Sequence, residues 1–232
     1  MNSWSPQILF EDNHLLVVNK APGEICQGDK TGDEPLPEKL KTFLKERDEK
    51  PGNVFLGVVH RLDRPASGVV VLAKTSKALE RMNAQIRDRE IEKTYWAIVP
   101  KRPDLAEGRL EHWLIKDQAN NRSKIVRPNT SGAKLAVLTY ALRASLERYH
   151  LIEVSLETGR HHQIRVQLSA IGCPIRGDLK YGSKRSNQDG SVSLHASRLR
   201  FVHPVRKDII TINAPPPPDP LWRLFVKALG ET

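Results

Sequence analysis

One polar segment of the chain places an acid between two arginines. Residues 60–68 read HRLDRPASG, so that Asp63 lies between Arg61 and Arg64. A carboxylate beside guanidinium groups stays ionised, and in that form it can act as a nucleophile or as a base. Apolar runs precede and follow the segment, which predicts a loop between two buried strands. A surface loop with an ordinary salt bridge is the alternative interpretation.

A second segment gathers positive and imidazole side chains where a helix is predicted to begin. Residues 158–165 read TGRHHQIR and include Arg160, His161, His162 and Arg165. The first turn of a helix attracts anions, and arginine binds phosphate through two parallel donors. Neighbouring histidines diverge by about 100° on a helix and no HExxH or CxxC accompanies them, so a zinc site is not predicted. A solvated helix surface is the alternative.

Aromatic and basic residues elsewhere fit the same kind of ligand. Tyr95 and Trp96 follow Lys93 at the start of a predicted strand. Aromatic rings that line a basic groove stack on nucleobases, although a place in the core of a sheet explains such a pair equally well. Arg198 and Arg200 alternate along a later strand and so share one face, which is either a phosphate-binding stripe or a solvated strand face.

Composition narrows the class of protein. The 232 residues include 37 Lys and Arg against 27 Asp and Glu, a formal charge of +10 that attracts polyanions. Cys26 and Cys173 are far apart and lack CxxC spacing, which argues against a zinc ribbon or a disulfide framework and fits a reducing compartment. No apolar run approaches 18 residues and no signal-peptide pattern opens the chain, so a cytoplasmic protein without a membrane segment is expected.

The elements that must position these residues are mostly strands. Helices are predicted over 37–49, over 76–89 with Ser76 as N-cap, from Thr158-Gly159 to Ile171, and over 221–230. Strands are predicted over 8–10, 15–18, 54–59, 68–73, 94–99, 109–115, 133–142, 150–156, 194–202 and 209–212. Short connections favour an antiparallel or mixed sheet and an α+β fold. One domain is expected over 1–232, with a core over 8–213, a Pro-rich spacer over 214–220 and a terminal helix over 221–230. This helix either caps the sheet or binds a partner.

Read together, the motifs resemble the RluA-type RNA pseudouridine synthases. They are HRLD at 60–63 with Ser67-Gly68, Lys93-Thr94-Tyr95, GRHHQIR at 159–165, GCPIRGD at 172–178, and the opening EDNHLLVVNK at 11–20. Their order matches, and so does the separation of 32 positions between Asp63 and Tyr95. The similarity extends from Ile8 to Pro204. It implies a pseudouridine-synthase-like fold with a central RNA-binding cleft. It also implies a stand-alone catalytic domain without the N-terminal RNA-binding domain of longer members.

The resemblance also implies an activity and its residues. The family isomerises uridine to pseudouridine in structured RNA, here ribosomal or transfer RNA, without cofactor or metal. Asp63 matches the catalytic aspartate, Tyr95 the tyrosine that stacks on the target uracil, and Arg165 the arginine that pairs with the aspartate. Whether Asp63 acts as nucleophile or base stays open. The expected substrate-binding residues are His60, Arg61, Arg160, His162, Gln163 and Ile164.

Two other functions compete with this one. A non-catalytic RNA-binding or RNA-folding protein on the same fold would be favoured by loss of Asp63, Tyr95 or Arg165, and all three are present. A metal-dependent nuclease using Asp63 and His60 is disfavoured because no second acid lies in that segment. The expected partner is RNA, with no membrane, no obligate protein partner and a monomeric state. Departures from the family pattern at Ala66, His161 and Gln167 bear on the choice of RNA.

Overall fold

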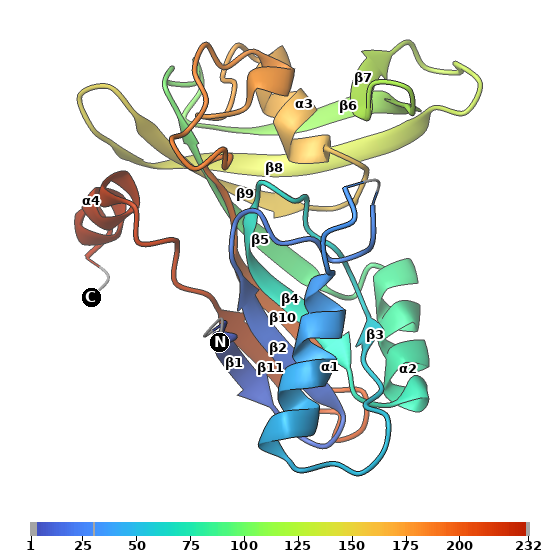
Figure 1. Cartoon of the computed structure of the whole chain (residues 1–232). Coiled ribbons are helices and arrows are strands. Elements are labelled where there is room, and N and C mark those ends of the chain that lie inside the picture. The colour runs from blue at the N-terminus through green and yellow to red at the C-terminus, as the bar shows by residue number, and fades with distance from the viewer. Residues whose placement is uncertain (1–3, 30, 231–232) are drawn as a thin grey trace. The chain divides into compact units, whose positions relative to one another are not determined.

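The computed structural model describes residues 4–29 and 31–230, and the chain divides into two compact units. The first unit comprises residues 1–91 and 196–216, and the second comprises 92–195 and 217–232. Each unit is built on antiparallel strands with helices packed beside them (Figure 1). That the two units act as one catalytic domain stays a prediction.

The first unit is a sheet in which strands far apart in the sequence are neighbours. Its order is β1-β2-β4-β10, with β3 paired to β4 and β11 paired to β10. The registers of β1 with β2, β2 with β4, β3 with β4 and β10 with β11 are antiparallel. The strands are β1 (Ile8–Glu11), β2 (Leu15–Lys20), β3 (Gly57–Val58), β4 (Ser67–Ala73), β10 (Leu194–Val202, of which 196–202 belong here) and β11 (Ile209–Asn213).

Strand β4 is the centre of this unit and leads directly out of the Asp63 segment. All seven of its residues are buried, which confirms the prediction that this apolar run is covered on both faces. Helix α2 (Ser76–Arg87) places Ala78 and Met82 in one cluster with Val69 and Val71 of β4. Helix α1 (Leu36–Arg47) buries a stripe spaced four residues apart, namely Leu36, Leu40 and Leu44.

Two sequence predictions in this unit are wrong in detail. The strand predicted over 54–59 is observed only as Gly57–Val58, which pairs with Leu72 and Ala73 of β4, and Phe55 is 47 % exposed. The N-cap of α2 is Thr75 rather than Ser76. The Thr75 hydroxyl accepts a hydrogen bond from the backbone N–H of Ala78 at 3.1 Å, which satisfies one of the free donors of the first turn.

The second unit is a fully antiparallel sheet in the order β5-β9-β8-β6-β7. Its strands are β5 (Glu92–Val99), β6 (Glu107–Asp117), β7 (Arg122–Val126), β8 (Lys134–Ser145) and β9 (His150–Leu156). Strand β7 has no counterpart among the predicted strands. It is an edge strand of five residues in which Arg122 and Lys124 replace the apolar alternation that marks a half-buried strand.

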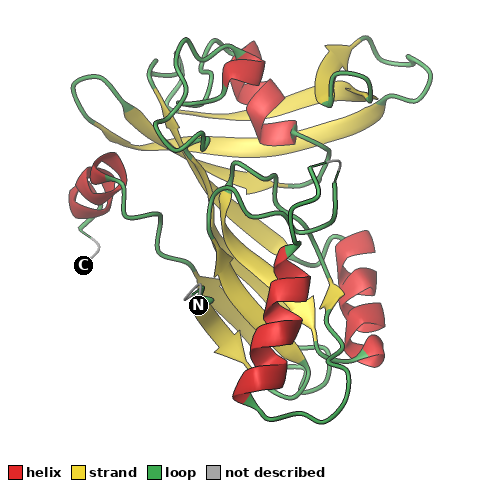
Figure 2. Cartoon of the chain, viewed as in Figure 1, coloured by secondary structure: helices red, strands yellow, loops and turns green. Residues whose placement is uncertain are grey.

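Helices cover this second sheet at two places. Helix α3 (Gln163–Ala170) lies beside the strands of this sheet (Figure 2). This helix and the 3-10 turn η1 (Leu179–Tyr181) contribute Val166 and Tyr181 to a cluster with Leu114 of β6. Helix α4 (Pro220–Ala228) packs Trp222 and Phe225 against β5 and β9, which confirms that the terminal helix caps the sheet. The predicted α+β class, with a mainly antiparallel sheet and flanking helices, is confirmed.

Candidate active site

The Asp63 segment is a tight turn at the entrance to β4. The carbonyl of Asp63 accepts a hydrogen bond from the backbone N–H of Ala66 at 3.1 Å, and the Asp63 side chain is half-buried. His60 folds back onto the strand, because its Nε2 accepts a hydrogen bond from the N–H of Val71 at 3.2 Å. The segment is therefore held close to the strand that follows it.

The two arginines beside Asp63 have contacts of their own. Arg61 is exposed and donates a hydrogen bond to Oε1 of Gln27. Arg64 forms ion pairs with Asp29 and Asp33, which raise the pKa of its guanidinium. The surface-loop interpretation expected an ordinary salt bridge in this segment. Such a salt bridge is present, and Arg64 forms it.

A buried lysine fixes the backbone immediately after Asp63. The Nζ atom of Lys20 donates to the carbonyls of Ala21, Glu24 and Arg64 at 2.8, 2.9 and 3.2 Å. The Arg64 carbonyl also accepts from the N–H of Gly23 at 2.8 Å. Burial lowers the pKa of Lys20 to about 8. Lys20 is not among the predicted site residues, although a lysine that stands two positions after a run of four apolar residues and directly before Ala-Pro-Gly is a usable signal.

Glycine is required where the segment enters β4. Gly68 has a φ of +117°, and a Cβ atom there would overlap the backbone of Ala196 in β10. Only a residue without a side chain combines this conformation with this close approach. Gly68 therefore sets the path of the chain between Asp63 and the buried strand.

In the second unit, Arg165 forms a buried ion pair. Its Nε and Nη2 atoms donate to Oδ2 and Oδ1 of Asp178 at 2.6 and 2.8 Å, and the two residues are 4 % and 1 % exposed. Such two-point pairs are strong and fix the orientation of the guanidinium plane. The carboxylate that meets Arg165 here lies in the segment that follows α3. Asp178 is not among the predicted site residues, although it ends the quoted GCPIRGD motif.

Tyr181 ties this ion pair to the start of α3. Its hydroxyl accepts from the N–H of Ser123 at 2.7 Å and lies 2.9 Å from Nδ1 of His162, and its ring centroid is 5.1 Å from Cζ of Arg165. Burial, and then the positive charge of Arg165, holds the pKa of His162 well below its usual value, so this imidazole is neutral. Ser123 also donates through Oγ to the carbonyl of His161.

The turn that leads into α3 is fixed by the amide of Gln163. Its Oε1 accepts from the hydroxyl of Thr158 at 2.8 Å and from the N–H of Arg160 at 2.9 Å, while its Nε2 donates to a backbone carbonyl of β8. Arg160 is half-buried and also donates to a β8 carbonyl, and Ile164 is buried. These contacts describe the positioning of the turn. The contacts of these residues with RNA stay predictions.

Tyr95 and Trp96 face opposite sides of β5 because neighbouring side chains on a strand alternate. Trp96 packs in the cluster formed with α4, so the core interpretation holds for this residue. Tyr95 therefore points to the sheet face opposite that cluster, where it is 9 % exposed. Lys93, two residues earlier, has a pKa lowered by burial.

The predicted site residues come from both units. His60, Arg61 and Asp63 lie in the first, whereas Tyr95 and residues 160–165 lie in the second.

Over residues 4–29 and 31–230, no group of three or more His, Cys, Asp and Glu side chains is placed to hold a metal ion. No helix of that described part is both long and apolar enough to cross a membrane. Cys26 and Cys173 are buried free thiols.

Comparisons with known proteins agree on one family. The sequence pattern of the RNA pseudouridylate synthase family matches residues 14–170. The "Uncharacterized RNA pseudouridine synthase YhcT" of Bacillus subtilis is 34 % identical over 216 residues, covering 91 % of this chain and 69 % of the relative. "Ribosomal large subunit pseudouridine synthase D" of Zymomonas mobilis is 35 % identical over 223 residues, covering 92 % and 70 %.

Solved structures share the fold. "Human RNA Pseudouridylate Synthase Domain Containing 4" superposes with a TM-score of 0.78 at 24 % identity, covering 97 % of this chain and 93 % of that one. "Human RNA Pseudouridylate Synthase Domain Containing 1" gives 0.69 at 23 % identity, covering 100 % and 98 %. The fold and the sequence match together confirm the resemblance to the RluA-type enzymes. The chain belongs to the RNA pseudouridylate synthase family and is an RNA-modifying isomerase.

Proposed function

We propose that this enzyme isomerises specific uridines of large-subunit ribosomal RNA, with Asp63 as its catalytic carboxylate. The observation that carries the proposal is the match over nine-tenths of the chain to relatives named as large-subunit pseudouridine synthases, at 34 and 35 % identity. Asp63 lies inside the matched range, in a motif that this chain retains. Transfer RNA is the alternative substrate, and the experiment below separates the two.

The reaction exchanges one bond to the sugar for another. The bond between N1 of uracil and C1′ of ribose breaks, the ring rotates, C5 bonds to C1′, and C5 loses its proton while N1 gains one. No electrons enter or leave, so the isomerisation consumes no oxidant or reductant. Asp63 starts the reaction, either by adding to the sugar or base or by removing a ribose proton. Tyr95 stacks on the uracil and accepts the C5 proton, and Arg165 pairs with the aspartate.

Physical considerations support these roles. A base must leave its stack to be reached, at a cost of a few kcal/mol, and stacking on an aromatic side chain returns roughly 1–3 kcal/mol. The Asp178 carboxylate holds the Arg165 guanidinium in one orientation, so that little reorganisation is needed when substrate binds. The formal charge of +10 attracts the RNA backbone.

Replacing the Asp63 carboxylate by an amide tests the proposal. We expect Asp63→Asn to abolish pseudouridine formation while RNA affinity stays within about twofold, because the isosteric amide removes a charge and no basic contact. RNA from cells lacking the gene is incubated with the enzyme, and pseudouridine is mapped by carbodiimide labelling in separate ribosomal and transfer RNA fractions. Asp33→Asn is the matched control, since that carboxylate is exposed and pairs with Arg64.

Each outcome of this experiment is decisive. If Asp63→Asn forms pseudouridine at the same rate as Asp33→Asn, Asp63 is not the catalytic carboxylate. New pseudouridine only in the transfer RNA fraction would overturn the ribosomal substrate. A monomeric state and a cytoplasmic location are part of the same proposal, and light scattering checks the first against the chain mass of 26.2 kDa.

A further inference from the structure

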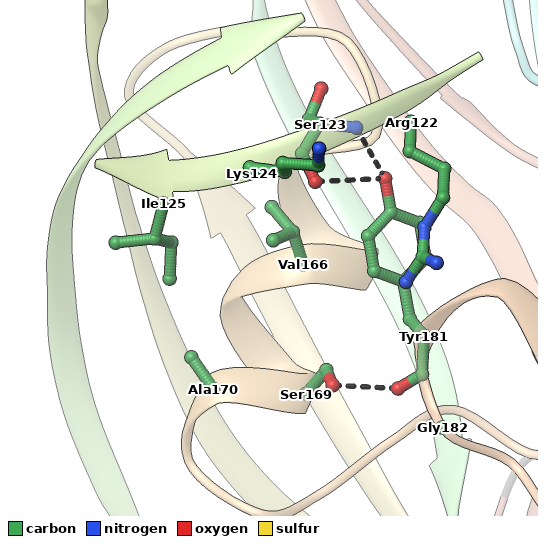
Figure 3. A pocket seen from close by; sticks show the side chains of 9 residues that line it. All are labelled: Arg122, Ser123, Lys124, Ile125, Val166, Ser169, Ala170, Tyr181 and Gly182. Carbon is green, nitrogen blue, oxygen red and sulfur yellow. Dashed lines mark hydrogen bonds between the residues drawn. The ribbon is translucent and has the colours of Figure 1, made fainter. Parts of the chain in front are cut away.

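The second unit has a pocket of about 450 Å³ between β7 and α3 (Figure 3). This volume lies within the roughly 300–1,000 Å³ of small-ligand sites. Exposed Arg122, Lys124 and Ile125 form its outer wall, so a ligand can enter from solvent. None of the predicted site residues lines it.

We propose that this pocket binds one nucleotide of the substrate RNA, distinct from the uridine that is isomerised. The proposal rests on the proposed function, because it assumes an RNA substrate. Val166, Ala170 and Ile125 supply apolar surface against which the face of a base can pack (Figure 3). Arg122 supplies the positive charge for its phosphate. Apolar walls with a few polar groups are the usual make-up of a ligand site.

Arg122 is suited to this role. Its Cζ lies 5.3 Å from the ring centroid of Tyr181, a cation-π contact that holds the guanidinium at the pocket. Within the described ranges it forms no ion pair with a carboxylate, so its charge is not neutralised by the protein. A planar guanidinium binds phosphate through two donors or stacks on a base.

The wall formed by Tyr181 is rigid before any ligand binds. Its hydroxyl accepts from the N–H of Ser123 at 2.7 Å, and its carbonyl accepts from the hydroxyl of Ser169 at 2.6 Å (Figure 3). A pre-formed wall lowers the cost of binding because fewer side chains are immobilised. The same ring contacts Arg165, so a single side chain connects the pocket to a residue of the proposed reaction.

The charge around the pocket favours a polyanion. The hairpin from Lys116 to Arg127 carries four basic side chains and one acid, Asp117, whose carboxylate pairs with Lys124 at 2.7 Å. Lys180 lies beside it, with its Nζ 3.4 Å from the carbonyl of Asn121. An acidic peptide would meet the same charges, but the combination of an apolar floor and a guanidinium held over an aromatic ring favours a nucleotide.

Binding is measured first with uridine 5′-monophosphate as the probe. We expect saturable shifts of the Ile125 and Val166 methyl resonances, and Arg122→Ala should raise the Kd about tenfold by removing a charge-assisted contact. Arg223→Ala removes the same charge from an exposed site on α4 and should leave the Kd unchanged. Absence of saturable shifts, equal Kd values for both variants, or tighter binding of a tetraglutamate peptide would overturn the nucleotide site.

Kinetics on ribosomal RNA then separate this proposal from the proposed function. We expect Arg122→Ala to raise KM about tenfold, leave kcat within about twofold, and reduce the slope of log KM against log salt by about one. If the wild type is active and Arg122→Ala matches Arg223→Ala, the pocket proposal fails and the function stands. If the wild type modifies no RNA, the proposed function fails, and the titration alone decides on the nucleotide site.

Discussion

The two units hold their candidate site residues by different physical means. In the first unit the Asp63 turn is fixed through the backbone. Lys20 and Gly23 donate hydrogen bonds to the Arg64 carbonyl. Gly68 lies against the backbone of Ala196. In the second unit Arg165 is fixed through side chains, by the carboxylate of Asp178 and the ring of Tyr181. The first arrangement depends on chain geometry and the second on buried charge.

The two units also differ in net charge. The first unit carries 18 Lys and Arg against 15 Asp and Glu, and several of its surface charges are paired, such as Glu11 with Arg47 and Lys74. The second unit carries 19 against 12, so most of the excess positive charge belongs to it. Long-range attraction of RNA therefore comes mainly from the unit that contains Arg165 and the β7 hairpin.

The largest effect is expected from removal of the buried carboxylate in the second unit. Asp178→Ala removes the two charge-assisted hydrogen bonds that this carboxylate accepts from the buried Arg165 guanidinium, so the free energy of unfolding should fall by about 3–5 kcal/mol. Urea unfolding of the full chain measures the change. Asp104→Ala is the control, because its side chain is 87 % exposed and its removal should change stability by less than about 0.5 kcal/mol.

A double variant shows whether the loss comes from the charge. If it does, adding Arg165→Leu to Asp178→Ala should recover part of the lost stability, because the buried guanidinium that has lost this carboxylate is then removed as well. Strictly additive losses would break the comparison, since Asp178 would then act only through packing.

The next effect concerns the backbone of the first unit. Gly68→Ala should lower the free energy of unfolding by about 1–3 kcal/mol from the positive φ alone, with a further loss from overlap with Ala196. Gly52→Ala is the matched control, because a Cβ there meets nothing within 4 Å. Thermal unfolding compares the two variants. Similar melting temperatures would mean that the close approach of β4 to β10 does not require a glycine at position 68.

The smallest effect is a pH dependence that arises in the second unit. His162 is neutral in the folded protein, whereas the unfolded chain takes up a proton below its ordinary pKa of 6.5. The free energy of unfolding is therefore highest above pH 6.5. It falls as the pH falls, by about 1 kcal/mol between pH 6.5 and 5.5. Urea unfolding at both pH values should show this difference in the wild type and a smaller one in His162→Gln. Equal differences would assign the pH dependence to other groups.

Local sequence was sufficient for much of the fold. The continuous apolar run of β4 indicates a strand that is buried on both faces. Gly172, with a φ of +73°, follows α3 where the helix ends. Strand β7 escaped prediction because an edge strand with Arg122 and Lys124 has little buried area to mark it. The residues of the five family motifs could likewise be named from the sequence, because a motif is a local pattern.

The sequence by itself determined the fold class, the element types and the family, since each depends on periodicity or on residues close together in the chain. Only the tertiary structure decided which side chains meet across the chain. Asp178 lies 13 positions from Arg165, and Ser123 lies 58 positions from Tyr181. Of the three carbonyls that accept from Lys20, that of Arg64 is 44 positions away. Such contacts follow from how strands pair and helices pack, and a local pattern carries no record of that arrangement.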